Sequence, residues 1–278
     1  MILIDNNQVI IANLFSMMKY NNEIDESFLR HMILNTYRMY RKKFHNRYGE
    51  LVICNDSRSW RKDIFEHYKA NRKKQKDKSD MDWNEVHNFM DKIREEVLET
   101  FPYKMLFVQN AEADDIIAIL CKHYWQIENI LIVSSDKDFQ QLQIFPSVSQ
   151  YSPIKKEMLV CDNPKNFLIE HIVRGDTSDG VPNVLSDDDV FICSDKRQKR
   201  ITKKIIEEAN NEISSGSIDN WNHWRRNEVL IDFKHIPEKI EDNIMKNYNK
   251  EISGSRGKIL SYMIEHRLGN LVDSIEDF

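Results

Sequence analysis

Three short apolar runs in this sequence are each followed by an aspartate, and this pattern limits the folds that the chain can adopt. The runs are residues 2–4, 51–54 and 130–133, and the aspartates are Asp5, Asp56 and Asp136. Runs rich in Ile, Leu and Val predict strands buried on both faces, as in a parallel sheet covered by helices. Because parallel strands end at one edge of a sheet, we expect the three carboxylates to meet there.

Helical patterns alternate with these strands. We expect helices at about 26–47 and 113–124, a further strand at 104–108, and a hairpin formed by 148–152 and 158–160. Alternating helices and strands predict an α/β fold with a parallel sheet. After about Asn163 the strand signal fades, and the remaining chain has a helical pattern to its end, where residues 271–278 are expected to pack on the core.

The cysteines and the N-terminus exclude several classes of protein. The four cysteines lie far apart and form no Cys-x-x-Cys pair, so the sequence indicates neither a zinc site nor a disulfide framework. The first residues lack the basic and apolar regions of a signal peptide. No apolar run approaches the roughly 20 residues that span a bilayer. We therefore expect a soluble, cytoplasmic protein.

Further carboxylates follow the same strands or open the helix at 113–124. Any one of them has an ordinary explanation, because the helix dipole favours acidic groups in a first turn by about 0.3–1 kcal/mol. The set is harder to explain, since two like charges about 4 Å apart repel by about 4 kcal/mol at an effective dielectric near 20. The additional residues are Glu112, Asp114, Asp115 and Asp138.

A cluster of six or more carboxylates predicts a bound cation. Oxygen ligands suit Mg²⁺ or Mn²⁺. No histidine falls into a matching position in the sequence, which argues against zinc. Carboxylate sites that hold two such ions are typical of phosphodiester hydrolysis.

A basic stretch follows Asp56. Residues 58–78 contain nine Lys or Arg against three acidic residues, with Trp60, Phe65 and Tyr68 interleaved. Cations and aromatic rings together suit a phosphate backbone and stacking bases. For residues 73–82 alone, the charge favours a solvated loop, whereas residues 60–72 favour nucleic-acid binding. A second basic run at 196–204 either contacts duplex backbone or forms an exposed helix face.

Taken together, these motifs resemble the structure-specific 5′-nuclease family, which includes flap endonucleases and the 5′-nuclease domains of bacterial DNA polymerases. The tail resembles the ribonuclease H branch of this family from T-even-type bacteriophages, through Val229-Leu230-Ile231-Asp232-Phe233 and the ending at 274–278. The N-terminal motifs are Asp5, Asp56, Tyr-Lys-Ala-Asn-Arg at 68–72, Glu-Ala-Asp-Asp at 112–115, Ser-Ser-Asp-Lys-Asp-Phe at 134–139 and Gly-Asp-x-x-Asp-Gly-Val-Pro at 175–182.

The resemblance implies a parallel-sheet, PIN-like 5′-nuclease core over residues 1–172, with a basic helical arch at about 58–90. Residues 173–278 would form a helical DNA-binding domain with a helix–turn–helix module around 175–182. Most family members follow this turn with a Gly-x-Gly-x-Lys-Thr sequence. Residues 184–189 lack the glycines of this sequence. The resemblance therefore leaves open whether the turn binds duplex DNA and whether it holds a potassium ion. The phage enzymes share this departure.

The resemblance also implies roles for individual residues. Lys69 and Arg72 would position the scissile phosphate, and Asp136 would be central to catalysis. The first metal group would be Asp5, Asp56, Glu112, Asp114 and Asp136, and the second Asp138, Asp176 and Asp179 with Asp136 shared. The nucleic-acid contacts would be Arg58, Arg61, Lys62, Tyr68, Lys69, Arg72, Lys199 and Lys203.

The implied function is that of a 5′→3′ exonuclease and flap endonuclease with two Mg²⁺ ions, for which Mn²⁺ can substitute. It would act as a monomer on branched or nicked duplex DNA and on RNA–DNA hybrids with a 5′ end, and would remove RNA primers during replication. A replication single-strand-binding protein or a sliding clamp is implied as a partner. Two alternatives stay open: a PIN-type ribonuclease for single-stranded RNA, and a catalytically silent binder of branched DNA.

Overall fold

A six-stranded sheet forms the centre of the computed structural model, which describes residues 1–19, 23–72, 81–193, 195–215 and 223–278. The strand order is β3-β2-β1-β4-β5-β6, and β6 alone pairs antiparallel to its neighbour in this sheet. The expected α/β fold with a mainly parallel sheet is therefore confirmed. The strands are β1 (Ile2–Asp5), β2 (Leu51–Asn55), β3 (Lys104–Phe107), β4 (Ile130–Val133), β5 (Val148–Ser152) and β6 (Glu157–Leu159).

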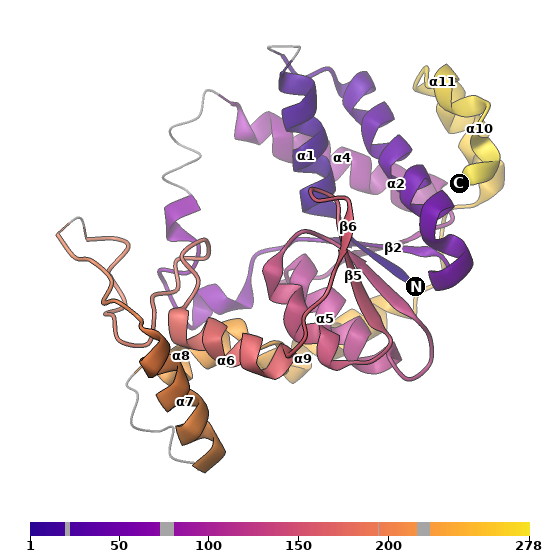
Figure 1. Ribbon diagram of the computed structural model, residues 1–278. Helices are drawn as coiled ribbons and strands as arrows, with labels where there is room; N and C mark the ends of the chain where they lie inside the picture. Colours follow the sequence, from indigo (N-terminus) through magenta and orange to yellow (C-terminus); the bar gives the residue numbers. More distant parts are fainter. Residues whose placement is uncertain (20–22, 73–80, 194, 216–222) are drawn as a thin grey trace.

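Helices cover both faces of the sheet, which is why its central strands are apolar throughout. In β1, Ile2 and Ile4 point to one core and Leu3 to the other, and all three are fully buried. The first face is covered by α1 (Asn6–Met18), α2 (Glu26–Tyr48) and α4 (Trp83–Thr100), and the second by α5 (Ala113–Tyr124) and α9 (Glu238–Tyr248) (Figure 1).

Two of these helices lie where the sequence analysis did not expect them. Helix α1 starts directly after β1, and the carboxylate of Asp5 accepts the hydrogen bond that caps it from the backbone of Gln8 at 3.2 Å. Helix α4 begins inside the segment expected to form an arch and continues ten residues beyond its expected end at 90. Of that arch the structure describes residues 58–72 and 81–90; the expectation for residues 73–80 lies outside the described part.

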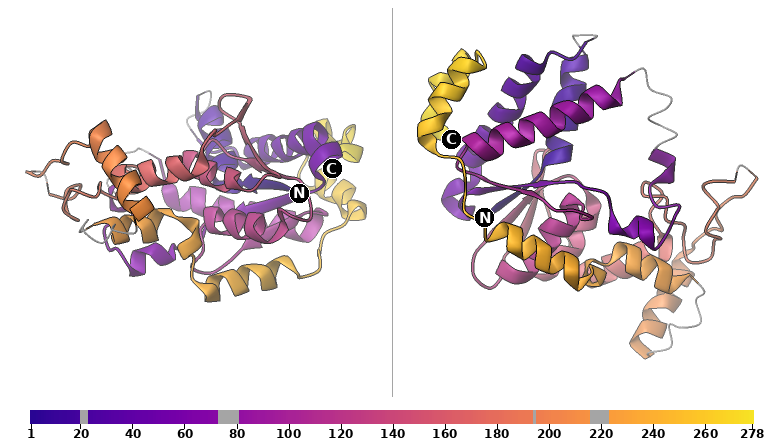
Figure 2. Two further views of the ribbon diagram at one scale, coloured as in Figure 1. Left: turned by 60° about the horizontal axis from the view of Figure 1, so that its bottom comes forward. Right: turned by 180° about the vertical axis from the view of Figure 1, so that it is seen from behind.

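The C-terminal part is helical, as expected. Helices α6 (Pro164–Arg174), α7 (Lys203–Ser215) and α8 (Trp224–Ile231) share a third, smaller core with Phe65 and Tyr68 of the basic stretch. Helices α10 (Arg256–Glu265) and α11 (Gly269–Val272) return to the layer that contains α2, as the two views in Figure 2 show. The last residue, Phe278, is fully buried with its ring centroid 5.5 Å from that of Phe101. Short 3-10 helices are η1 (Trp60–Asp63), η2 (Lys137–Ile144), η4 (Phe233–His235) and η5 (Ile275–Asp277).

The turn after α6 is closed by a bridge between Asp176 and Val181. Its first residue, Gly175, has a φ of +67°, and a Cβ there would lie 2.4 Å from the carbonyl oxygen of Val181. No helix follows directly: the described residues between 183 and 202 form turns, one bend and irregular backbone before α7 begins. The structure thus shows the turn but not the second helix of the expected helix–turn–helix module.

Among the described helices, none is long and apolar enough to cross a membrane.

Candidate active site

Carboxylates from four elements converge at the carboxyl edge of the sheet. Asp5 ends β1, Asp56 follows β2, Asp136 follows β4, and Asp114 lies in the first turn of α5. Strands β2, β1 and β4 are adjacent and parallel, so these ends lie side by side. The sheet therefore brings together the aspartates predicted to follow its strands.

Burial and mutual repulsion raise the pKa values of this group. Burial, with the nearby charge of Asp56, raises the pKa of Asp5 from 3.8 to about 7. The pKa of Asp114 is also raised well above its usual value, by burial and by the charges of Asp136 and Asp5. Neutralising these carboxylates in the native fold requires either bound protons or a bound cation.

Hydrogen bonds fix the positions of Asp5 and Asp56. The hydroxyl of Ser134 donates to Asp5 at 3.0 Å. One oxygen of Asp56 accepts from the backbone N–H of Ala113 at 2.7 Å, at the start of α5, and the other accepts from the amide of Asn7 at 2.5 Å. The favourable end of the α5 dipole thus faces Asp56.

The carboxylate of Glu112 forms ion pairs with two residues of the basic stretch, Arg61 and Lys69. It is 5% exposed, and Nζ of Lys69 lies 2.5 Å from its Oε1. Although burial opposes ionisation, Lys69 and Arg61 lower the pKa of Glu112 to about 2. The other oxygen, Oε2, accepts from Tyr68 at 3.0 Å, Ser59 at 2.5 Å and Arg61 at 3.2 Å.

Asp138 and Asp176 form a second group next to the first, across the contact between η2 and α6. One oxygen of Asp176 accepts from the backbone and the hydroxyl of Ser178. Its other oxygen lies 2.9 Å from Nζ of Lys137 and 3.0 Å from Nε2 of His171. Burial opposes ionisation of Asp176, but the hydrogen bonds from His171, Ser178 and Lys137 hold its pKa below the usual value.

Asp179 connects the second group to the basic stretch. Its carboxylate accepts from the hydroxyl of Tyr68 at 2.8 Å and from the guanidinium of Arg72 at 2.6 Å. Nζ of Lys69 lies 3.4 Å from the same carboxylate. Lys69 therefore stands between Glu112 and Asp179, in contact with both carboxylate groups.

A cavity of about 1130 Å³ opens beside these residues. Asp56 and Glu112 line it on the acidic side, and helix α4 supplies much of the opposite wall. Four of the basic residues predicted to bind nucleic acid also line it: Arg58, Lys62, Lys69 and Arg72.

Comparison with known proteins agrees with this arrangement. A family model for the 5'-3' exonuclease, N-terminal resolvase-like domain, matches residues 1–168, and one for T4 RNase H, C terminal, matches residues 164–278. The chain is 32% identical to the ribonuclease H of Enterobacteria phage T4, over 99% of this chain and 95% of that protein. The chain belongs to the 5′-3′ exonuclease family. Its relatives in this family are nucleases.

One further relative is similar in sequence, and two solved structures share the fold. A 5'-3' exonuclease of Buchnera aphidicola is 28% identical over 66% of this chain and 64% of its own length. The T5 D15 protein crystallised with metal ions has the same fold, with a TM-score of 0.61 at 16% identity, over 88% of this chain and 97% of that one. A D15 flap endonuclease complex with DNA and metal ions aligns with the same TM-score and identity, over 96% of its chain.

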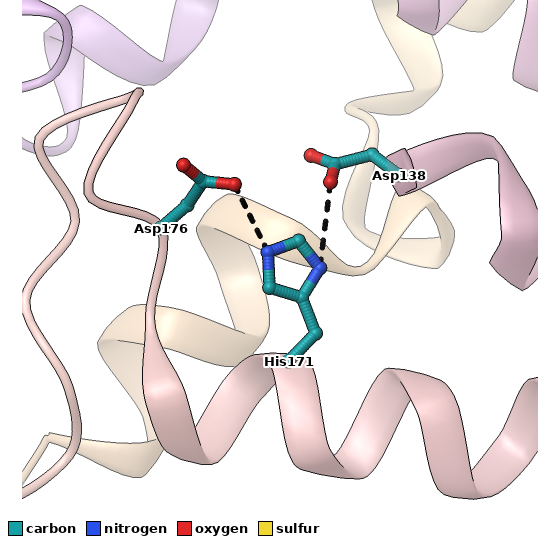
Figure 3. A group of neighbouring side chains, drawn as sticks. All are labelled: Asp138, His171 and Asp176. Atoms are coloured by element: carbon teal, nitrogen blue, oxygen red, sulfur yellow. Dashed lines mark hydrogen bonds and ion pairs between the residues drawn. The ribbon is translucent and has the colours of Figure 1, made fainter. Parts of the chain in front are cut away.

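One histidine of this chain corrects the expectation that no histidine has a matching position. His171, in the last turn of α6, lies between Asp138 and Asp176 (Figure 3). The sequence analysis missed it because the stretch around His171 has only an ordinary helical pattern. Packing of α6 against η2 brings the imidazole to the two carboxylates.

Two residues expected to contact nucleic acid lie inside the protein in this structure. Arg61 is 3% exposed, and its guanidinium donates to Asp115 at 2.8 Å and to the carbonyl of Leu230 at 2.8 Å. Tyr68 is 4% exposed, and its hydroxyl bonds to Glu112 and Asp179. Both side chains therefore hold the site together from inside. Lys199 and Lys203 are exposed on the C-terminal part, away from the cavity lining.

Proposed function

We propose that this exonuclease-family protein is a divalent-metal-dependent 5′→3′ exonuclease and flap endonuclease that hydrolyses RNA or DNA annealed to DNA. The observation that carries the proposal is the meeting of Asp5, Asp56, Asp114 and Asp136 at one edge of the sheet. Burial makes this group unfavourable without a counter-charge. A divalent cation supplies that charge.

The donors of the first group fit a hard cation. They are carboxylates, and oxygen ligands suit Mg²⁺, for which Mn²⁺ can substitute. A second ion belongs to the neighbouring group of Asp138, Asp176 and Asp179, with Asp136 shared. Bound ions of this kind supply a more acidic water and neutralise charge that develops on the phosphate.

Lys69 and Arg72 are proposed to position the phosphate. Both line the cavity, and both are already ordered by Asp179, so they present fixed positive charge beside the carboxylates. Fixed charge aimed at the reacting group stabilises a transition state without reorganisation. Arg58 and Lys62, on the same cavity, would contact the sugar–phosphate backbone.

The names of the relatives support the proposed substrate. One is named a ribonuclease H, and another is a flap endonuclease bound to DNA. We propose that this protein removes RNA primers from lagging-strand fragments in the host-cell cytoplasm, as a monomer. Residues 1–172 would carry catalysis. Residues 173–278 would hold the duplex, with the 175–182 turn and with Lys199 and Lys203 on the path of its backbone.

The test is cleavage of a 5′-flap substrate with Mg²⁺ by the wild type and Asp136→Asn. We expect the variant to lose cleavage by at least about 100-fold while its affinity for the duplex is kept. Asp242→Asn, an exposed change on α9, is the matched control. Cleavage at the normal rate in Asp136→Asn would reject the metal assignment. Preference for single-stranded RNA without regard to a 5′ end would favour a PIN-type ribonuclease instead, and no cleavage by the wild type would indicate a silent binder.

A further inference from the structure

The imidazole of His171 is held in an unusual position between two carboxylates. It is 5% exposed, its Nε2 lies 3.0 Å from Oδ2 of Asp176, and its Nδ1 lies 3.5 Å from Oδ1 of Asp138 (Figure 3). Within the described residues, the buried Nδ1 of His171 and the buried Oδ1 of Asp138 each lack a hydrogen-bond partner. Buried polar atoms are nearly always paired, so two that face each other point to a missing ligand.

The partners of Asp176 determine which ring nitrogen carries the proton. The Oδ2 of Asp176 also forms an ion pair with the ammonium of Lys137, and its Oδ1 accepts a hydrogen bond from the backbone N–H of Ser178. Both oxygens of Asp176 therefore act as acceptors. Nε2 of His171 is therefore the N–H donor, and Nδ1 presents its lone pair. In the neutral imidazole that lone pair faces an oxygen of Asp138, and a metal cation bound between them would pair both buried atoms.

We propose that Nδ1 of His171 and the carboxylate of Asp138 are ligands of the same divalent ion, and that Asp176 orients the imidazole. Histidine ligands of metals commonly donate their second ring N–H to a carboxylate, which fixes the ring and its tautomer. One N or O atom from each of Asp138, His171 and Asp176 lies within 4.8 Å of the other two, so the three side chains form one compact group. The inference rests on the proposed function, because it concerns the second ion of that site.

An imidazole ligand changes which ions this position prefers. Carboxylates alone suit Mg²⁺ and Mn²⁺, whereas an imidazole nitrogen favours transition ions such as Fe²⁺, Ni²⁺ and Zn²⁺, and Mn²⁺ accepts such a ligand more readily than Mg²⁺ does. His171 is therefore assigned as the residue that determines metal preference at the second position. The first group has carboxylate donors and would keep its preference for Mg²⁺.

The test is Mn²⁺ binding to the full-length, metal-free protein, measured by calorimetry and by pulsed electron paramagnetic resonance. Wild type saturated with Mn²⁺ should show coupling to a ring nitrogen. His171→Gln, which keeps an N–H to donate to Asp176, should lose that coupling and bind one Mn²⁺ at least tenfold more weakly, with less than a threefold change for Mg²⁺. His123→Gln is the control, because His123 also pairs with a carboxylate, that of Glu241, but far from the site.

Two results would overturn the inference. Absence of nitrogen coupling in the Mn²⁺-saturated wild type would do so without any variant. Tighter Mn²⁺ binding in His171→Gln would show that the ring is only a counter-charge that competes with the ion. Either result leaves the proposed nuclease intact if the flap assay still requires a divalent ion, so the two failures are distinguishable.

Discussion

The ammonium of Lys69 lies 2.5 Å from a carboxylate oxygen of Glu112, so a proposed phosphate contact is paired with a proposed metal ligand. The backbone of Lys69 has a φ of +57°, a left-handed conformation uncommon for lysine, and its N–H donates to the carbonyl of Asp179 at 2.7 Å. Strained residues of this kind persist where the surrounding contacts hold them. Lys69 and Arg72 thus neutralise Glu112 and Asp179, and we expect metal and phosphate to take over these partners.

Replacement of this lysine should affect both activity and stability. In Lys69→Met, Glu112 loses its closest cation but keeps Arg61, Ser59 and Tyr68, so we expect the free energy of unfolding to fall by about 1–3 kcal/mol. Single-turnover cleavage should fall by at least about 100-fold.

The matched control for this prediction is Lys92→Met. Lys92 forms a surface pair with Glu26 at 2.6 Å, which contributes less than about 1 kcal/mol. Urea unfolding and single-turnover assays on both variants measure the difference. Full cleavage by Lys69→Met would exclude the lysine from phosphate positioning.

Arg61 and Lys62 are neighbours in sequence with opposite environments. The guanidinium of Arg61 is buried against Asp115 and Glu112, so Arg61→Met should destabilise the fold by about 3–5 kcal/mol. Lys62 is exposed and lines the cavity, so Lys62→Met should leave stability unchanged within about 0.5 kcal/mol.

The two substitutions should have the opposite order of effect on nucleic-acid binding, where Lys62 matters and Arg61 does not. Lys62→Met should weaken nucleic-acid binding uniformly across sequences and lower the salt dependence by about one counterion. Denaturation curves and binding isotherms at several salt concentrations test both variants. A folded Arg61→Met with weakened, salt-shifted binding would restore the contact first predicted for Arg61.

The contrast within this pair shows what sequence could and could not predict. Strand ends and the aspartates after them were predictable, because a doubly buried strand has a local apolar signature and its end has a fixed place in a parallel sheet. The burial of Arg61 was not, since it depends on Leu230 and Asp115 from distant elements. His171 was missed for the same reason: its position depends on how α6 packs on η2.

The stability of the metal-free protein should decrease as pH rises. In the folded state, burial and the charge of Asp56 raise the pKa of Asp5 to about 7, whereas an unfolded aspartate ionises near 4. Between these values the folded state holds the proton and the unfolded state does not. Folding therefore takes up protons, and stability falls from about pH 4 to about pH 7.

Asparagine cannot ionise, so the Asp5→Asn variant should not show this loss of stability between pH 4 and pH 7. In EDTA, the variant should be more stable than wild type at pH 8, by on the order of 1–3 kcal/mol, and equal to it near pH 4. Added Mg²⁺ should stabilise wild type more than the variant. Chemical denaturation at both pH values measures this, with exposed Asp242→Asn as control. An equal difference at pH 4 and pH 8 would contradict the assignment of Asp5 as the titrating group.

Gly175 should be required for the second carboxylate group. In Gly175→Ala, the new Cβ would meet the carbonyl oxygen of Val181 at 2.4 Å, and φ at +67° disfavours any side chain. The carbonyl of Val181 accepts from the backbone N–H of Asp176 at 2.8 Å, so relief of the clash must move that aspartate. We expect the free energy of unfolding to fall by at least about 1 kcal/mol and Mn²⁺ affinity to fall with it.

Gly269→Ala provides the control, because a Cβ there meets nothing within 4 Å. Its stability should change by no more than about 0.5 kcal/mol, and its Mn²⁺ affinity should stay that of wild type. If Gly175→Ala lost stability but bound Mn²⁺ normally, the turn would support the fold without positioning Asp176. Loss of both together is expected, because the bridge that closes the turn includes Asp176 itself.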